Sequence, residues 1–307
     1  MMSSPALPAA VPTASADQAE EPLPSDGWPG GLAALRARLD EIDDDMHDLL
    51  MRRALVVEQV AKAGKRGAYR PGREASMIRR LLARHSGPLP PQALVRIWRE
   101  LLAGTTAMQG PFSVAVCQTD TAMGFIQVAR EHFGALTPMH VHRSPAQAIA
   151  EVSADTASVA VLPLPSETEP PRDAWWTALL HRDAPRIHVV ARLPFWMPRP
   201  EGDADVQALV VAPNPPDPSG QDRTLIGLEL DLEASRARLN AALTAASLTP
   251  GTVIVLRRDP GASVAHAVVE VDGFLEDNDA RLAGVDAVLR PPVVLGAYAV
   301  PANGAAA

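Results

Sequence analysis

Residues 31–67 read GLAALRARLDEIDDDMHDLLMRRALVVEQVAKAGKRG and contain no proline, although the whole chain has 30 prolines in 307 residues. Apolar side chains recur there in alternating steps of three and four residues, at Leu32, Leu35, Leu39, Ile42, Met46, Leu49, Val56, Val60 and Ala63. This heptad spacing predicts one long α-helix. At about 1.5 Å per residue the helix would be about 54 Å long. That length is excessive for a compact monomer and predicts packing against a partner chain.

One position of this apolar seam, between Leu49 and Val56, is occupied by Arg53. An unpaired charge that faces a core is very costly. The guanidinium therefore forms a salt bridge with an internal acid, reaches solvent along its aliphatic stem, or binds a carboxylate or phosphate ligand. The pattern alone leaves these three interpretations open.

Two further helices are predicted over residues 73–85 and 92–109, and Gly110 and Pro111 close this helical unit. Thr105 and Gln109 lie one turn apart on the otherwise apolar face of the third helix. Residues 31–109 carry fourteen Arg and Lys against nine Asp and Glu, within a chain of net charge −8. A basic, helical, dimer-prone unit with inward-facing Arg, Thr and Gln predicts a pocket for a small dianion.

Composition excludes several classes of protein. No stretch approaches the roughly 20 apolar residues of a membrane helix, and the single cysteine, Cys117, excludes an intrachain disulfide and a cysteine-cluster metal site. The acidic balance argues against a nucleic-acid binder. The sequence contains no glycine-rich phosphate loop and no histidine spacing typical of a metal site, so we expect no cofactor and no metal. Residues 1–29 predict a disordered tail without a secretory signal, and hence a cytoplasmic protein.

After Pro111 short strands alternate with helices, which predicts an α/β lobe over residues 111–212 and a second module over 222–305. The expected strands are 113–117, 139–142, 158–162, 186–190, 208–211, 224–230, 252–256, 265–271 and 293–298, and the expected helices are 125–132, 145–151, 233–246 and 277–285. Pro-rich loops are expected at 163–174 and 194–222. The second module has the β-α-β-β-α-β order of ferredoxin-like folds. The fold class is therefore α+β and multidomain.

Three segments in order resemble the all-helical chorismate mutases: LAALRARLDEIDDDMHDLLMRRALVVEQVAKAGK, RPGREASMIRRL and RIWRELLAGTTAMQ. The resemblance covers residues 31–110 and sets a domain at 30–110. It implies an intertwined homodimer whose long first helix is shared by two active sites. It also implies an isomerase that converts chorismate to prephenate in phenylalanine and tyrosine biosynthesis. That rearrangement needs no nucleophile, metal or cofactor; it needs a folded dicarboxylate and stabilised charge on the breaking ether oxygen.

The resemblance assigns roles to the basic residues of this unit. Arg53 would bind one substrate carboxylate, and Arg36 from the second subunit would reach the other. A lysine should meet the ether oxygen, and the family places it at the position of Gly64. Lys65 is one place away and Lys62 is two, and we expect Lys65 to serve.

The same resemblance assigns the remaining polar positions. Arg73 and Glu74 match the Arg-Glu pair at the start of the second helix, and Glu74 would accept the substrate hydroxyl. Thr105 would lie near a carboxylate, and Gln109 would donate to the ether oxygen. Arg70 stands where some relatives carry an acid, which leaves Glu74 alone beside the hydroxyl.

The remainder of the chain resembles a reduced prephenate dehydratase followed by an ACT domain. The segments that carry this resemblance include FSVAVCQTDTAMGFIQVAREHFG and VLGAYAVP. Residues 195–206 are too short for a second dehydratase lobe, and the family's Thr-Arg-Phe motif aligns with Gln207, Ala208 and Leu209. We therefore expect a non-catalytic C-terminal half with phenylalanine as a possible effector. The alternatives are a bifunctional mutase–dehydratase and a non-catalytic, ligand-binding partner of an aromatic-pathway enzyme.

Overall fold

A computed structural model describes residues 31–63, 69–118, 124–170, 173–181, 186–197, 206–286 and 288–303. Two compact units divide the chain, Met1–Leu55 and Val56–Ala307. Lys65 and residues 1–29 lie outside the described residues. No described helix is both long and apolar enough to cross a membrane.

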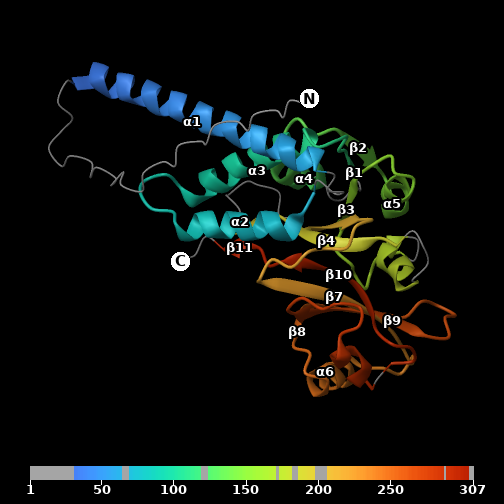
Figure 1. The fold of residues 1–307 in the computed structure, drawn as a ribbon. Helices are drawn as coiled ribbons and strands as arrows, with labels where there is room; N and C mark the ends of the chain where they lie inside the picture. Colours follow the sequence, from blue (N-terminus) through green and yellow to red (C-terminus); the bar gives the residue numbers. More distant parts are fainter. Residues whose placement is uncertain are drawn as a thin grey trace, which may run out of the picture. The chain divides into compact units, whose positions relative to one another are not determined.

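Helix α1 spans Gly31–Lys62, so the proline-free stretch does form one long helix (Figure 1). None of its residues is buried within the single chain. The seam residues Leu39 and Leu49 are 60% and 59% exposed. Its length and apolar seam match the expectation from the heptad spacing.

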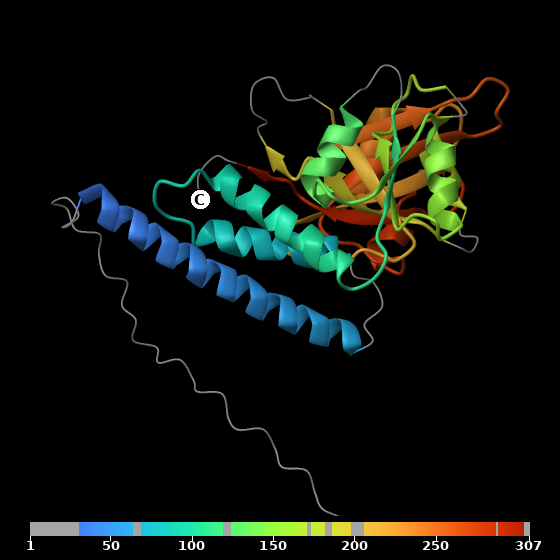
Figure 2. The same ribbon diagram turned by 90° about the horizontal axis from the view of Figure 1, so that it is seen from above.

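Helices α2 (Pro71–Ala83) and α3 (Pro91–Ala107) lie side by side in the second unit (Figures 1 and 2). Each begins with a proline in its first turn, where the missing N–H costs nothing. A small core that includes Ala75, Ile78 and Val95 joins them to Phe195 and Ala299 of the C-terminal part. The two helices are therefore packed onto the sheet region that follows them in sequence.

The rest of the second unit is built on a nine-stranded sheet with the order β2-β1-β3-β6-β4-β10-β7-β9-β8. The strands are β1 Val114–Cys117, β2 Met139–His142, β3 Val159–Pro163, β4 His188–Leu193, β6 Ala208–Ala212, β7 Asp222–Leu230, β8 Pro250–Arg257, β9 Ala265–Asp272 and β10 Val293–Ala299. Strands β2, β1 and β3 are parallel, with α4 (Phe125–Phe133) and α5 (Pro145–Ser153) as crossovers.

The last four strands, in the order β10-β7-β9-β8, form the ferredoxin-like module. Helix α6 (Arg236–Ala245) begins where the Ser235 hydroxyl accepts the Arg238 N–H at 3.2 Å. The predicted helix over 277–285 is wrong: the chain forms only the 3-10 turn η3 (Ala280–Gly284), which is capped by Asp279. Five residues between a capping aspartate and a glycine are too few for a regular α-helix.

Three short elements were not expected from the sequence. They are the 3-10 helix η2 (Trp175–Leu180) and the paired strands β5 (Trp196–Met197) and β11 (Ala302–Asn303). Strand β5 falls in a stretch that we expected to be loop. Its partner β11 lies more than a hundred residues away in the chain, and local sequence does not reveal such a pairing.

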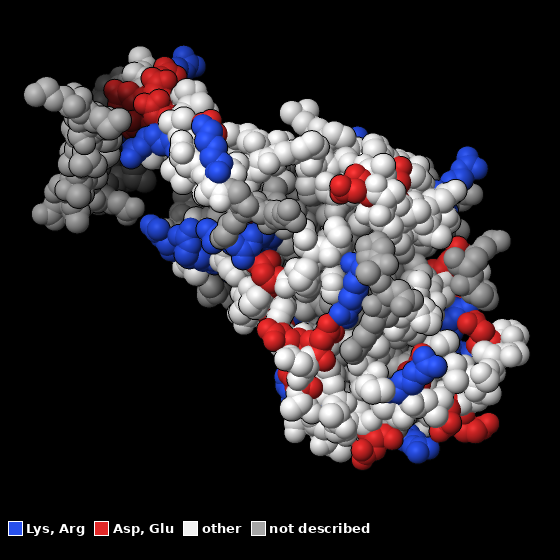
Figure 3. Space-filling view, turned by 45° about the vertical axis from the view of Figure 1, so that its right-hand side comes forward, with Lys and Arg blue, Asp and Glu red and all other residues white. Residues whose placement is uncertain are grey.

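The α/β strands and the ferredoxin-like strands meet where β4 pairs in parallel with β10, at Val189 and Gly296. Gly296 has a φ of +141°, and a Cβ there would lie 2.0 Å from the Val189 carbonyl oxygen. Only glycine allows this close approach of two backbones. Acidic and basic side chains are interspersed over the surface of the ferredoxin-like part (Figure 3). Ion pairs such as Arg290–Glu229 at 3.3 Å lie there.

Candidate functional site

The candidate residues of α1 lie in different units. Arg36 and Arg53 are on the part of α1 that belongs to the first unit. Lys62 is the last residue of α1, and its Nζ lies 2.6 Å from Oε1 of Glu58, one turn back on the helix surface. The structure thus assigns Lys62 a surface ion pair, and the ammonium expected from Lys65 is outside the described residues.

The adjacent residues Arg73 and Glu74, at the start of α2, face opposite ways. Arg73 is exposed, whereas Glu74 is only 9% exposed. Oε2 of Glu74 accepts a hydrogen bond from Nη1 of Arg99 at 3.0 Å, and Arg99 on α3 is itself 4% exposed. The Arg99 guanidinium also lies over the ring of Phe195, 4.9 Å from its centroid. Sequence reasoning missed Arg99, because nothing in the local sequence distinguishes this arginine from Arg96, the other arginine of α3.

Burial dominates the electrostatics of this pair. Removal from water raises the pKa of Glu74 from its usual 4.5 to about 7, although the Arg99 charge works in the opposite direction. Burial likewise lowers the pKa of Arg99. A carboxylate that titrates near neutral pH is suited to exchanging a proton or a hydrogen bond with a ligand.

Two more titratable groups, the half-buried Tyr69 and the buried His132, lie beside this pair. The Tyr69 hydroxyl is 3.0 Å from Nε2 of His132 on α4. Burial raises the pKa of Tyr69 well above its ordinary value and lowers that of His132 well below, with the Arg99 charge adding to the second shift. The phenol and the imidazole are therefore both neutral near pH 7. Tyr69 and His132 both pack against Phe133, with ring centroids 5.3 and 4.7 Å from it.

Thr105 and Gln109 are close together at the end of α3. Oγ1 of Thr105 donates to the Leu101 carbonyl at 2.9 Å, and Nε2 of Gln109 donates to the Thr105 carbonyl at 3.0 Å. Gln109 also lines a cavity of about 480 Å³ with Arg70 and Asp217, whose side chains form an ion pair at 3.0 Å. Glu74 lines a different cavity, of only about 10 Å³. The structure therefore brings Thr105 and Gln109 together but places Glu74 in another cavity.

The middle of α2 is held by the turn that precedes β7 and by the residue that follows β10. The guanidinium of Arg79 donates to Oγ of Ser219 at 3.0 Å and to the carbonyls of Gln221 and Val300. Oγ of Ser76 donates to the Ser219 carbonyl at 2.8 Å. These contacts attach the helix that carries Glu74 to the C-terminal half of the chain.

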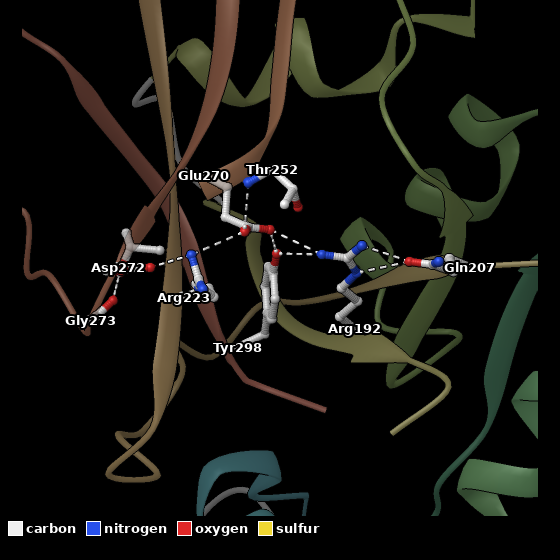
Figure 4. A network of polar contacts seen from close by, with 9 residues as sticks. Arg192, Gln207, Arg223, Thr252, Glu270, Asp272, Gly273 and Tyr298 are labelled. Atoms are coloured by element: carbon white, nitrogen blue, oxygen red, sulfur yellow. Dashed lines mark hydrogen bonds and ion pairs between the residues drawn. The ribbon is translucent and has the colours of Figure 1, made fainter. Parts of the chain in front are cut away.

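Gln207, the first of the three positions that align with the dehydratase motif, belongs to a polar network at the junction of the sheet (Figure 4). Oε1 of Gln207 accepts from Nη2 of Arg192 at 2.6 Å, and Nη1 of Arg192 donates to Oε2 of Glu270 at 3.0 Å. The Tyr298 hydroxyl donates to the same carboxylate. Ala208 and Leu209 are buried within β6. The three positions that align with the motif thus carry no hydroxyl side chain, and the Gln207 amide oxygen is bonded by Arg192.

No group of three or more side chains suited to holding a metal ion is found among the described residues. His140 and His142 of β2 both approach Glu151, at 2.7 and 3.2 Å, as a surface ion-pair cluster.

Comparison with known proteins assigns the N-terminal helices. Residues 35–110 match the model of the family described as chorismate mutase type II. Proteins described as bifunctional chorismate mutase/prephenate dehydratase are similar to this chain. The one from Stutzerimonas stutzeri is 30% identical over 147 residues, covering 45% of this chain and 40% of that protein. The one from Neisseria gonorrhoeae is 32% identical over 100 residues, covering 32% and 27%.

The chain thus spans less than half the length of these curated relatives. Among solved structures, GqqA, described as a novel type of quorum quenching acylase, has a TM-score of 0.46 at 16% identity, covering 63% of this chain and 96% of that one. Prephenate dehydratase from Streptococcus mutans has a TM-score of 0.45 at 14% identity, covering 62% and 98%. Residues 35–110 of this chain are therefore similar to the chorismate mutase type II family, in agreement with the sequence motifs of the N-terminal helices.

Proposed function

We propose that this chain is an isomerase that converts chorismate to prephenate. The observation that carries the proposal is the family match over residues 35–110, a range that contains every candidate site residue. The rearrangement is unimolecular, so the protein has only to fold the substrate and to stabilise charge at the ether oxygen. Arginines suit the two carboxylates because their donors form a planar, bidentate fork.

In this proposal Arg53 binds one carboxylate and Arg36 of a second copy binds the other. Thr105 supports a carboxylate, while Gln109 and Lys65 donate to the ether oxygen. Arg73 is exposed near the start of α2 and would approach a substrate carboxyl or hydroxyl from there. The apolar seam of α1, which the single chain leaves exposed, supports a homodimer.

Glu74 accepts the substrate hydroxyl. Arg99 donates to Oε2, the Arg70 backbone also hydrogen-bonds the carboxylate, and the substrate hydroxyl would be a further donor to it. Because its pKa is raised to about 7, the ionisation of Glu74 near neutral pH sets how strongly the group accepts the hydrogen bond of the substrate hydroxyl.

The C-terminal half is proposed to be non-catalytic, because Gln207 is bound by Arg192 where the dehydratase motif would place a threonine. Phenylalanine as an effector and a cytoplasmic location remain predictions. Calorimetric titration of the full chain with phenylalanine tests the first of these: heat of binding supports a sensor role, and its absence contradicts it.

The decisive experiment is incubation of the purified chain with chorismate, followed by chromatographic separation of the products. We expect chorismate to disappear and prephenate to accumulate without phenylpyruvate. Unchanged chorismate would overturn the proposal in favour of a non-catalytic partner protein. Phenylpyruvate would show instead that the chain is bifunctional.

Substitution of Arg53 tests where the pocket lies. Arg53→Ala should lower kcat/KM at least about 100-fold, because a bidentate carboxylate contact is lost. Arg52→Ala is the matched control, since Arg52 is the preceding, exposed residue of the same helix. We expect this control to stay within about twofold of the wild type. Equal effects of the two substitutions would mean that the pocket has been misplaced.

A further inference from the structure

A second, smaller cavity of about 60 Å³ lies between α3, α4 and the turn after β4. The side chains of Arg96, Arg99, Glu131 and His132 line it together with the rings of Phe195 and Trp196. None of these residues is among the candidates for chorismate. The cavity therefore combines positive charge, a buried imidazole and aromatic walls outside the proposed catalytic pocket.

The buried polar groups of this cavity have unused hydrogen-bonding capacity. His132 is 8% exposed, and its Nδ1 is buried without a hydrogen-bond partner in the described part of the chain. A buried, unpartnered ring nitrogen is costly, and such a group calls for an explanation. Arg99 has five N–H donors, of which Nη1 engages Glu74. Donors of Arg99 thus remain for a ligand beside the imidazole.

The hydrogen bond between Tyr69 and His132 determines which ring nitrogen carries the hydrogen, and hence whether the cavity suits a hydrogen-bond acceptor or a donor. When the Tyr69 hydroxyl donates to Nε2, Nδ1 carries the hydrogen and becomes a donor. An acceptor placed between Arg99 and Nδ1–H satisfies both groups, whereas a cation would be repelled by the guanidinium. A negatively charged acceptor is therefore the ligand that matches this wall of the cavity.

We propose that this cavity is a binding site for a small monocarboxylate. Its oxygens would lie between Arg99 and Nδ1–H of His132, with Arg96 at the rim and the apolar end against Phe195 and Trp196. A volume of about 60 Å³ accommodates a few heavy atoms but not chorismate. Glu131 on the wall disfavours a dianion such as phosphate, because it adds a second negative charge nearby.

A ligand bound in this cavity would also weaken the interaction between Arg99 and Glu74. The consequence for turnover rests on the proposed function. Arg99 is shared between Glu74 and the cavity, so a bound carboxylate competes with Glu74 for one guanidinium. Glu74 would lose part of the charge that favours its ionised form. Binding is therefore expected to lower turnover of chorismate near pH 7.

Titration of the full chain with sodium acetate tests the site, with sodium chloride keeping the ionic strength constant. Acetamide is the matched neutral ligand of the same shape. The nitrogen resonances of the His132 ring, followed by NMR, should change saturably with acetate and report a protonated Nδ1. Acetamide should leave them unchanged. Equal responses to acetate, acetamide and chloride, or no response to any of them, would overturn the proposal.

Variants separate the site from general salt effects. His132→Phe keeps the ring packing but removes Nδ1 and should weaken acetate binding at least tenfold by calorimetry. Arg96→Ala, at an exposed position that cannot threaten the core, should weaken binding about threefold. His181→Phe, an exposed histidine outside the cavity, is the control. Unaltered acetate affinity in Arg96→Ala and His132→Phe contradicts the site.

The rate measurement is separate from the binding measurement. Acetate should lower kcat/KM for chorismate in the wild type and not in His132→Phe. Acetate binding without an effect on turnover would overturn the competition for Arg99. A chain that binds acetate but never converts chorismate would contradict the proposed function and leave the binding site standing.

Discussion

Two buried glutamates in this chain have very different surroundings. Glu270 on β9, 2% exposed, is bonded by Arg192 at 3.0 Å, by the Tyr298 hydroxyl and by the Thr252 N–H at 3.4 Å, with Arg223 at 3.5 Å (Figure 4). Glu74 on α2 has one side-chain partner, Arg99, and lies beside small cavities. The first carboxylate is surrounded by donors from several strands, and the second is not.

This difference separates a structural carboxylate from one that is available for chemistry. A buried charge is tolerated when hydrogen bonds satisfy all of its lone pairs, and such a network fixes the position of the strands. A buried charge with fewer partners keeps a shifted pKa and capacity for a ligand. The comparison predicts that changes at Glu270 alter stability, whereas changes at Glu74 alter turnover.

The largest effect is expected from Glu270→Ala. It leaves Arg192 and Arg223 without their shared partner, and breaking a buried ion pair costs about 3–5 kcal/mol. Denaturant unfolding should show this loss, while kcat/KM for chorismate, measured where the variant is folded, stays near the wild-type value. Glu276→Ala, an exposed acid of the same module, should change stability by less than about 0.5 kcal/mol. A stable Glu270→Ala would show that the network is not what holds these strands.

Glu74→Gln should lower kcat/KM about 100-fold, which corresponds to about 2.7 kcal/mol of transition-state stabilisation. The amide retains the size of the side chain, but its neutral oxygen accepts hydrogen bonds from the substrate hydroxyl and from Arg99 less strongly than a carboxylate does. Steady-state kinetics with chorismate measure the loss, and Glu270→Gln is the paired control. Comparable rate losses in both variants would remove the distinction between the two carboxylates.

Gly296→Ala should destabilise the second unit by about 2 kcal/mol, because the new Cβ would lie 2.0 Å from the Val189 carbonyl oxygen at a φ of +141°. Gly261→Ala is the matched control: its φ is +78°, but nothing lies within 4 Å of its Cβ. It should cost about 1 kcal/mol. Equal midpoints of thermal unfolding for the two variants would contradict a tight contact between β4 and β10.

The smallest effect is a pH dependence from Glu74. With a pKa of about 7, turnover should rise about tenfold between pH 6 and pH 8 as the carboxylate ionises. Because the folded-state pKa is raised, the same group lowers the free energy of unfolding as the pH rises from about 4.5 to about 7. Arg99→Gln should move the midpoint of the rate profile upward, and a profile that is flat between pH 6 and pH 8 would contradict this assignment.

Local pattern predicted most of the elements. The proline-free heptads identified α1, and nearly every strand from β1 to β10 fell within a few residues of its expected place. Helix 277–285 failed because the apolar residues there fit a helix but the capping aspartate and glycine stop it after five residues. In the candidate site, the sequence motifs singled out Glu74, Thr105 and Gln109 as candidates. Arg99, Tyr69 and His132 were not, because they come together from separate elements.

The sequence by itself determined the helical unit, the strand order along the chain and the similarity of residues 35–110 to chorismate mutase type II, because periodicity and motif spacing are properties of neighbouring residues. Only the tertiary structure decided that Glu74 pairs with Arg99, that β10 joins β4, and that His132 keeps a buried nitrogen without a partner. These features depend on which distant segments share a low-dielectric interior. There, burial sets both the cost of an unpaired group and the direction in which its pKa moves.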